Sequence, residues 1–199
     1  RGLANKTPVM ILRGNHDYIE PSRPFFGFLG GIPQVTYVGE IMDVELFGAE
    51  ALALPHTRDP EQDWRGLRVE KYDYVFLHHT FNGAQASNGM VLTGPPASRW
   101  RSDRPCKVFS GDVHVPQKIG PVVYAGAPYH IHFGDSFEPR VLLVTTGLTD
   151  LHYPTVRKYV LEVRTLKELT TQLTKIGEGH QVKIRFTLGK EEALDWKKY

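Results

Sequence analysis

The chain has 199 residues, of which 41% are hydrophobic and 23% are charged, a composition typical of a globular protein with a sizeable core. Its 24 Lys and Arg residues against 22 Asp and Glu residues give a net charge of +2, which excludes a nucleic-acid binder driven by overall charge. A single cysteine, Cys106, excludes an intramolecular disulfide framework, and the sequence has neither an apolar run long enough to span a membrane nor the apolar segment of a signal peptide.

The first predicted element is a buried strand over Val9–Leu12, which stops abruptly at the polar sequence Gly-Asn-His-Asp at positions 14–17. In an α/β sheet, the carboxyl ends of parallel strands are where ligands bind. Because Gly-Asn and His-Asp are also common turn formers, a simple strand-to-loop turn is the alternative. In the irregular loop that follows, we expect Phe25, Phe26, Phe28 and Leu29 to pack on the core, with capping of a substrate groove as the other option.

Three short β-rich segments come next, at residues 35–38, 44–47 and 51–54. Their spacing favours a compact meander. We expect His56, in the loop after the third segment, to form only local hydrogen bonds.

The sequence then indicates the beginning of a helix. Asp59 is suited to the N-cap, Pro60 to the first helical position, and Gln62 follows three residues after the cap. Trp64 and Leu67 are expected to lie on one apolar face of this helix.

Two further buried strands, at residues 74–77 and 107–110, also stop at polar residues. The first leads into His-His-Thr at 78–80 and the second into Gly-Asp-Val-His at 111–114. Since three strands each end with histidine and an oxygen donor, we expect their carboxyl ends to assemble one site. Amide, imidazole and carboxylate donors suit a divalent cation such as manganese, zinc or iron, and a neutral amide adds no charge that would repel a phosphate.

In their order, these motifs resemble the calcineurin-like metallophosphoesterase superfamily, and within it the SbcD-type nuclease subunit of DNA double-strand-break repair complexes. The resemblance covers residues 8–190 and is strongest from Tyr74 to Pro128, where Gly-Asp-Val-His-Val-Pro-Gln precedes Val-Tyr-Ala-Gly-Ala-Pro. It implies an α/β fold, a partial four-layer α-β-β-α sandwich over residues 1–150. The start of a small α+β capping domain, which helps to position DNA, would follow over residues 151–199.

The resemblance also assigns roles to individual residues. It implies that Asn15 binds one metal ion, that His114 binds the other, and that His16 assists the leaving group. Asp17 would fix the tautomer of a neighbouring imidazole, and an Asx-turn or helix cap is an equal alternative.

Two positions in the motifs require a choice. Of the adjacent histidines, His78 matches the metal-binding position because it directly follows the apolar run, and a one-residue slip would exchange it with His79. Asp112 stands where the family usually has histidine. We expect Asp112 to be a ligand that favours Mn²⁺ or Mg²⁺, and a weakened second metal site is the alternative.

The superfamily builds its two-metal site with two further motifs, Asp-x-His and Gly-Asp-x-x-Asp, and neither occurs before Gly14. We therefore expect the chain to be an N-terminally truncated form of a complete enzyme, inactive by itself, with a naturally shortened scaffold as the alternative. The complete protein would hydrolyse phosphodiester bonds in DNA with two divalent cations, Mn²⁺ or Mg²⁺. It would work as a homodimer with an SbcC-like ATPase in the cytoplasm of a bacterium or phage-infected cell. A small-substrate phosphatase or phosphodiesterase is a further alternative.

A basic stretch precedes the third site strand and offers a second functional hint. Arg99, Arg101 and Arg104 could hold a DNA backbone while Trp100 stacks on an unpaired base. A solvated loop is the alternative.

The remaining segments are expected to complete the main sheet and to begin the capping domain. Residues 140–145 are predicted to join the sheet, and residues 158–163 to form a strand. A capping box at Thr165 and Glu168 opens a helix through Lys175, and the alternating residues 181–188 form another strand.

Overall fold

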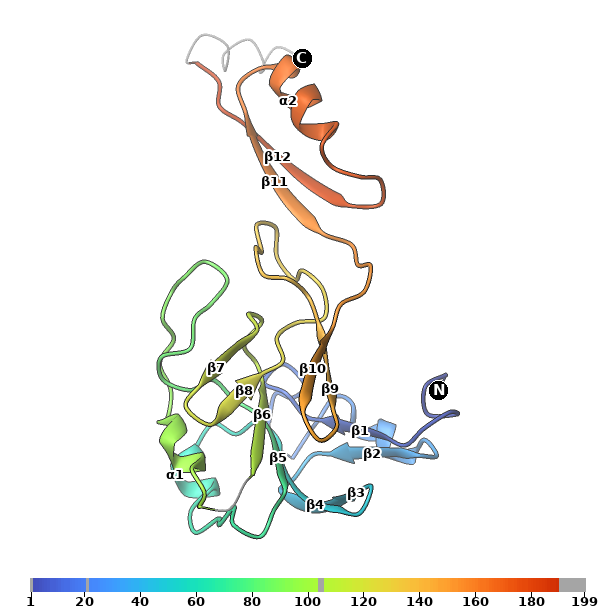
Figure 1. The fold of residues 1–199 in the computed structure, drawn as a ribbon, viewed down its shortest axis with the longest axis vertical. Coiled ribbons are helices and arrows are strands. Elements are labelled where there is room, and N and C mark those ends of the chain that lie inside the picture. The colour runs from blue at the N-terminus through green and yellow to red at the C-terminus, as the bar shows by residue number, and fades with distance from the viewer. Residues whose placement is uncertain (1, 21, 104–105, 190–199) are drawn as a thin grey trace. The chain divides into compact units, whose positions relative to one another are not determined.

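The computed structural model describes residues 2–20, 22–103 and 106–189. Over these residues the chain is a mixed α/β protein dominated by strands (Figure 1). It divides into two compact units, Arg1–Gly126 and Ala127–Tyr199. The predicted domain boundary at residue 150 lies inside the second unit and stays a prediction. In the described part of the chain, no helix is both long and apolar enough to cross a membrane.

The main sheet of the first unit has six strands in the order β3-β4-β5-β6-β8-β7. Its strands are β3 (Met42–Leu46), β4 (Ala49–Leu54), β5 (Tyr74–His78), β6 (Lys107–Gly111), β7 (Gln117–Ile119) and β8 (Val122–Tyr124). The four inner strands, β4, β5, β6 and β8, are parallel, whereas β3 and β7 run antiparallel at the two edges. The carboxyl ends of β4, β5 and β6 therefore share one edge of the sheet.

A second sheet of the first unit pairs β1 (Val9–Leu12) in parallel with β2 (Val35–Val38). The predicted meander is wrong here, because β2 pairs with β1 and only β3 and β4 form a hairpin. The hairpin has a local cause: Phe47 and Gly48 both have positive φ angles, of 53° and 80°, as a tight turn between antiparallel strands requires.

The loop between β1 and β2 contains the short 3-10 helix η1 (Gly27–Gly31), which has no buried residue. The prediction that its phenylalanines pack on the core is wrong. Phe25, Phe26 and Phe28 are 50%, 43% and 69% exposed, because η1 lies at the surface, and Phe26 and Phe28 contact each other instead.

The core of the first unit lies against the main sheet and is rich in aromatic side chains. Helix α1 (Pro60–Asp63) leads into it, and the predicted N-cap is confirmed, since the Asp59 carboxylate accepts a hydrogen bond of 3.1 Å from the Gln62 amide. The helix ends after a single turn, yet Trp64 is still only 1% exposed. The largest fully buried side chains of this core are Leu52, Leu54, Trp64, Val75, Leu77, Phe81, Trp100, Val108, Val122 and Tyr124.

The second unit contains a hairpin and a β-α-β segment. β9 (Val141–Val144) pairs with β10 (Leu148–Leu151), so the prediction that residues 140–145 complete the main sheet is wrong. The short connection between the two strands lets the chain fold straight back on itself.

The β-α-β segment consists of β11 (Lys158–Val163), helix α2 (Leu166–Leu173) and the parallel strand β12 (Gln181–Phe186). The predicted N-cap is confirmed: the Thr165 hydroxyl accepts a hydrogen bond of 3.2 Å from the Glu168 amide. The Glu168 carboxylate accepts from the Arg164 amide at 2.7 Å, one residue before the Thr165 amide that a full capping box uses.

Candidate metal centre

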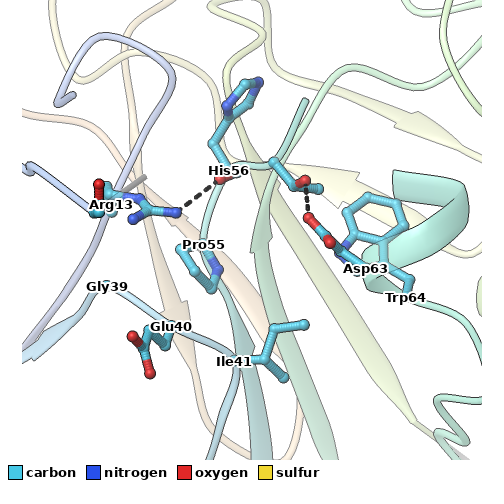
Figure 2. Close-up of a pocket in the computed structure, with 10 residues that line it drawn as sticks. Arg13, Gly39, Glu40, Ile41, Pro55, His56, Asp63 and Trp64 are labelled. Atoms are coloured by element: carbon cyan, nitrogen blue, oxygen red, sulfur yellow. Dashed lines mark hydrogen bonds between the residues drawn. The ribbon is translucent and has the colours of Figure 1, made fainter. Parts of the chain in front are cut away.

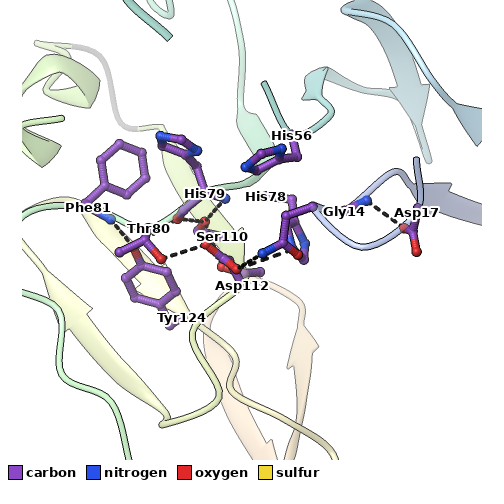
Figure 3. A network of polar contacts seen from close by, with 12 residues as sticks. Gly14, Asp17, His56, His78, His79, Thr80, Phe81, Ser110, Asp112 and Tyr124 are labelled. Carbon is purple, nitrogen blue, oxygen red and sulfur yellow. Dashed lines mark hydrogen bonds and ion pairs between the residues drawn. The ribbon is translucent and has the colours of Figure 1, made fainter. Parts of the chain in front are cut away.

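Three polar side chains from the ends of β1, β5 and β6 meet at one point. The Asn15 side-chain amide donates to Asp112 Oδ1 at 2.8 Å, and its Oδ1 lies 3.3 Å from His78 Nε2. His78 Nε2 is also 3.8 Å from Asp112 Oδ1. The structure thus brings together three of the four predicted metal ligands, of which His78 and Asp112 are labelled in Figure 3.

Two glycines, each the first residue of its motif, pack closely against the His78 imidazole. A Cβ atom on Gly111 would lie 2.4 Å from His78 Nδ1, and one on Gly14 would lie 2.9 Å from His78 Cε1. Neither position can carry a side chain unless the ring moves. The first glycines of Gly-Asn-His-Asp and Gly-Asp-Val-His are therefore required by the packing of one histidine.

The neighbouring His79 faces the aromatic core instead. Its ring contacts Trp64 edge-on at 5.1 Å between centroids and Phe81 at 5.8 Å. Its backbone is fixed by Ser110, whose hydroxyl accepts from the His79 amide at 3.1 Å and donates to the His79 carbonyl at 2.8 Å. Alternation along the strand thus places His78, and not His79, beside Asn15.

Asp112 is held in an unfavourable backbone conformation. Its φ angle is 77°, in the left-handed region that costs energy for any residue with a side chain. Its two carboxylate oxygens accept hydrogen bonds from Asn15 at 2.8 Å and from the Thr80 hydroxyl at 2.6 Å. These bonds aim the carboxylate at the cluster.

The other motif residues surround the cluster. Asp17 Oδ2 accepts a hydrogen bond of 2.7 Å from the Gly14 amide, three residues earlier in the chain. This bond is not the Asx-turn or helix cap given as the alternative, in which the side chain accepts from a later amide. His16 is exposed and His114 is half-buried, and both are close enough for their charges to lower the pKa of His78.

His56 also belongs to this region, and the expectation that it forms only local hydrogen bonds is wrong. Its ring lies 6.3 Å from that of His78 and 5.5 Å from that of His79. The Tyr18 hydroxyl, 38 positions away, is 2.9 Å from its Nδ1, and Arg13 donates to its carbonyl at 3.2 Å. The signal was in the sequence, because His56 follows β4 just as the predicted site residues follow their strands.

Burial keeps these imidazoles neutral. It lowers the pKa of His56 to about 4, with a smaller contribution from His79. Burial also lowers the pKa values of His78 and His79, against the opposing effect of the Asp112 carboxylate. Neutral imidazole is the form that binds a metal ion.

Part of the basic stretch that was predicted to bind DNA packs in the core instead. Trp100 is 2% exposed and packs edge-on against Trp64 at 5.2 Å, so it has no free face for a base, which corrects the expectation. The Arg99 guanidinium donates to the Trp64 carbonyl and lies over both indole rings. Arg101 is exposed, and Arg104 lies outside the described residues.

Three side chains of the cluster could together hold one divalent cation. Among residues 2–20, 22–103 and 106–189, no group of three or more His, Cys, Asp or Glu side chains is arranged to hold a metal ion. The amide oxygen of Asn15 lies beside His78 and Asp112, and these three side chains offer the mixed nitrogen and oxygen donors that manganese accepts.

No family model matches the chain, and a search of curated proteins finds no significant match.

Proposed function

We propose that this chain carries part of a divalent-metal site that hydrolyses phosphodiester bonds in DNA. The observation that supports this most directly is the meeting of Asn15, His78 and Asp112 from three separate strand ends. A turn-forming role for each motif would not require this convergence, nor two glycines fitted around one imidazole.

Each side chain has a task in this proposal. Asn15, His78 and Asp112 hold one divalent cation, and His114 contributes to a second. The cations would supply positive charge to the phosphate and make a water molecule more acidic. His16, which is exposed beside Asn15, donates a proton or hydrogen bond to the departing sugar oxygen. Asp17 keeps the loop closed through the Gly14 amide.

The proposal also includes a fold, partners and a location for the whole protein. We assign the first part of the chain to a four-layer α-β-β-α sandwich of the metallophosphoesterase type. The β11-α2-β12 segment, with its parallel strands, would begin the capping domain of an SbcD-type nuclease. DNA, an SbcC-like ATPase and a second copy of the chain are the proposed partners, and the bacterial or phage-infected cytoplasm is the proposed location.

Mn²⁺ binding to the full-length protein tests the site directly. Bound Mn²⁺ loses its sharp solution electron paramagnetic resonance signal, so titration gives the affinity without reference to activity. We expect Asn15→Ala to weaken binding about tenfold or more. Asn88→Ala, which removes an exposed loop amide, is the matched control and should leave the affinity unchanged. Equal affinities in both variants would refute the assignment.

Hydrolysis is measured on the same preparations. Bis-p-nitrophenyl phosphate and linear duplex DNA should both be cleaved in the presence of Mn²⁺. Tight Mn²⁺ binding without cleavage of either substrate would favour the non-catalytic scaffold, and cleavage of the small ester alone would favour the small-substrate phosphodiesterase.

A further inference from the structure

A cavity of about 370 Å³ lies beside the candidate metal centre (Figure 2). It is formed at the carboxyl ends of β1, β2 and β4, with the beginning of β3 and the end of α1 completing it. His56 belongs to both places, because its backbone lines the cavity and its ring contacts His78. The cavity is lined by Arg13, Ser22, Gly39, Glu40, Ile41, Pro55, His56, Thr57, Asp63 and Trp64.

The walls of the cavity combine apolar surfaces with polar groups at the ends. Figure 2 shows Arg13 on one side and Asp63 and Trp64 on the other, with Pro55 and Ile41 between them. The Asp63 carboxylate is held by the Thr57 hydroxyl. Such a shape offers flat apolar contacts to a ring and hydrogen bonds to its edge.

The charge of the lining selects the kind of ligand. One guanidinium, from Arg13, is set against the carboxylates of Glu40 and Asp63. The excess of negative charge disfavours a phosphate group. A neutral planar heterocycle with both donors and acceptors at its edge fits these walls, and the volume lies within the range of about 300–1,000 Å³ that is usual for small-molecule sites.

We propose that this cavity is a nucleobase-binding subsite, which takes the unpaired base of a nucleotide adjacent to the phosphodiester bond at the metal centre. The position of that nucleotide beside the bond at the metal centre rests on the proposed function, whereas binding of a base to the cavity does not. Enzymes that do chemistry on a base hold the extruded base in a pocket and read it by hydrogen bonds at its edge and contacts to its faces, and the same contacts could hold a base next to a scissile phosphodiester bond. Here Ile41 and Pro55 supply the faces, and Arg13 and Asp63 the edge contacts.

Binding of free nucleosides to the full chain, without metal, tests the subsite. Saturation-transfer NMR with each of the four 2′-deoxynucleosides should show transfer to base protons, and 2-deoxyribose 5-phosphate, which has no base, should show none. Absence of binding by all four nucleosides, or equal binding of the sugar phosphate, would overturn the proposal.

Two variants locate the binding. Asp63→Ala removes an acceptor at the edge of the cavity, and we expect the dissociation constant of the best nucleoside to rise about three- to tenfold. Glu61→Ala is the matched control, because it removes an exposed carboxylate of the same helix that does not line the cavity. Ile41→Trp, at the half-exposed rim, should fill the cavity and abolish binding. Equal effects of Asp63→Ala and Glu61→Ala, or binding that survives Ile41→Trp, would place the nucleoside elsewhere.

Cleavage assays separate this proposal from the proposed function. Bis-p-nitrophenyl phosphate has no base, so Ile41→Trp should slow the cleavage of DNA much more than the hydrolysis of this ester. Nucleoside binding in a protein that cleaves neither substrate would leave the subsite standing and refute the hydrolase. Equal loss of both activities in Ile41→Trp would refute the link between subsite and metal centre.

Discussion

The Nε2 atom of His78 lies 3.3 Å from the side-chain oxygen of Asn15, although 63 positions separate the two residues. Their strands belong to different sheets, and β1 contacts β5 where the sheets approach each other. The cluster is therefore a product of how the sheets pack, and its geometry depends on residues that hold the imidazole rather than on any local turn.

His16→Ala should separate metal binding from catalysis. The side chain is exposed beside Asn15 and is not part of the contacts among Asn15, His78 and Asp112. We expect the full-length variant to keep its Mn²⁺ affinity and to lose about 10²-fold or more in the rate of DNA cleavage, the usual contribution of a general acid. Paramagnetic resonance and cleavage rates give the two values. Normal turnover by the variant would contradict the role of His16.

Gly111→Ala should displace the His78 ring. The added Cβ would lie 2.4 Å from Nδ1, a distance that the ring can only relieve by moving. We expect a weaker Mn²⁺ affinity and a lower melting temperature. Gly31→Ala is the control, because a Cβ at Gly31 meets no atom within 4 Å and the backbone there is not left-handed. Unchanged affinity in Gly111→Ala would show that His78 is not a ligand.

Acid should destabilise the metal-free protein through His56. Its pKa is about 4 in the folded protein and returns to the ordinary 6.5 on unfolding, so the unfolded chain binds protons more readily in between. The contribution of neutral His56 to the free energy of unfolding is fully present above pH 6.5 and is lost as the pH falls towards 4. Urea unfolding at pH 7 and pH 4.5 in the presence of EDTA should show a smaller pH dependence for His56→Gln than for the wild type. Identical dependence in both proteins would be inconsistent with this origin.

The two arginines that flank Trp100 should behave differently. Arg99→Glu removes the hydrogen bond to the Trp64 carbonyl and the contacts with both indoles, so we expect it to lower the free energy of unfolding by about 1 kcal/mol. Arg101→Glu should leave stability unchanged and reduce the slope of log affinity against log salt concentration for DNA by about 1. An unchanged slope would favour a merely solvated loop.

Much of the strand pattern could be predicted because it depends on short apolar runs. The strands at residues 9–12, 35–38 and 158–163 begin and end as expected, and the polar residues after β5 and β6 do meet at one edge. Pairing was harder to predict, since β2 could join either β3 or β1 and only long-range packing decides between them.

The errors at the site have physical causes too. Trp100 lies in a basic stretch and looked like a surface residue, yet the core around Trp64 needed a second large ring. The phenylalanines of the β1–β2 loop showed the reverse, since hydrophobicity alone does not say whether a loop reaches the core. His56 follows a strand as the predicted site residues do, which was the available signal, but its Tyr18 partner lies 38 positions away and no spacing in the sequence reveals that contact.

The hydrogen bond between Asn15 and Asp112 joins positions 97 residues apart, which has a consequence for the order of folding. Closing so long a loop is costly in entropy, and parallel strands cannot pair until the intervening chain has crossed over. The polar cluster should therefore form only after the strands of both sheets have come together. A ligand of the finished cluster would bind the native state alone, so it should slow unfolding without accelerating the first steps of refolding.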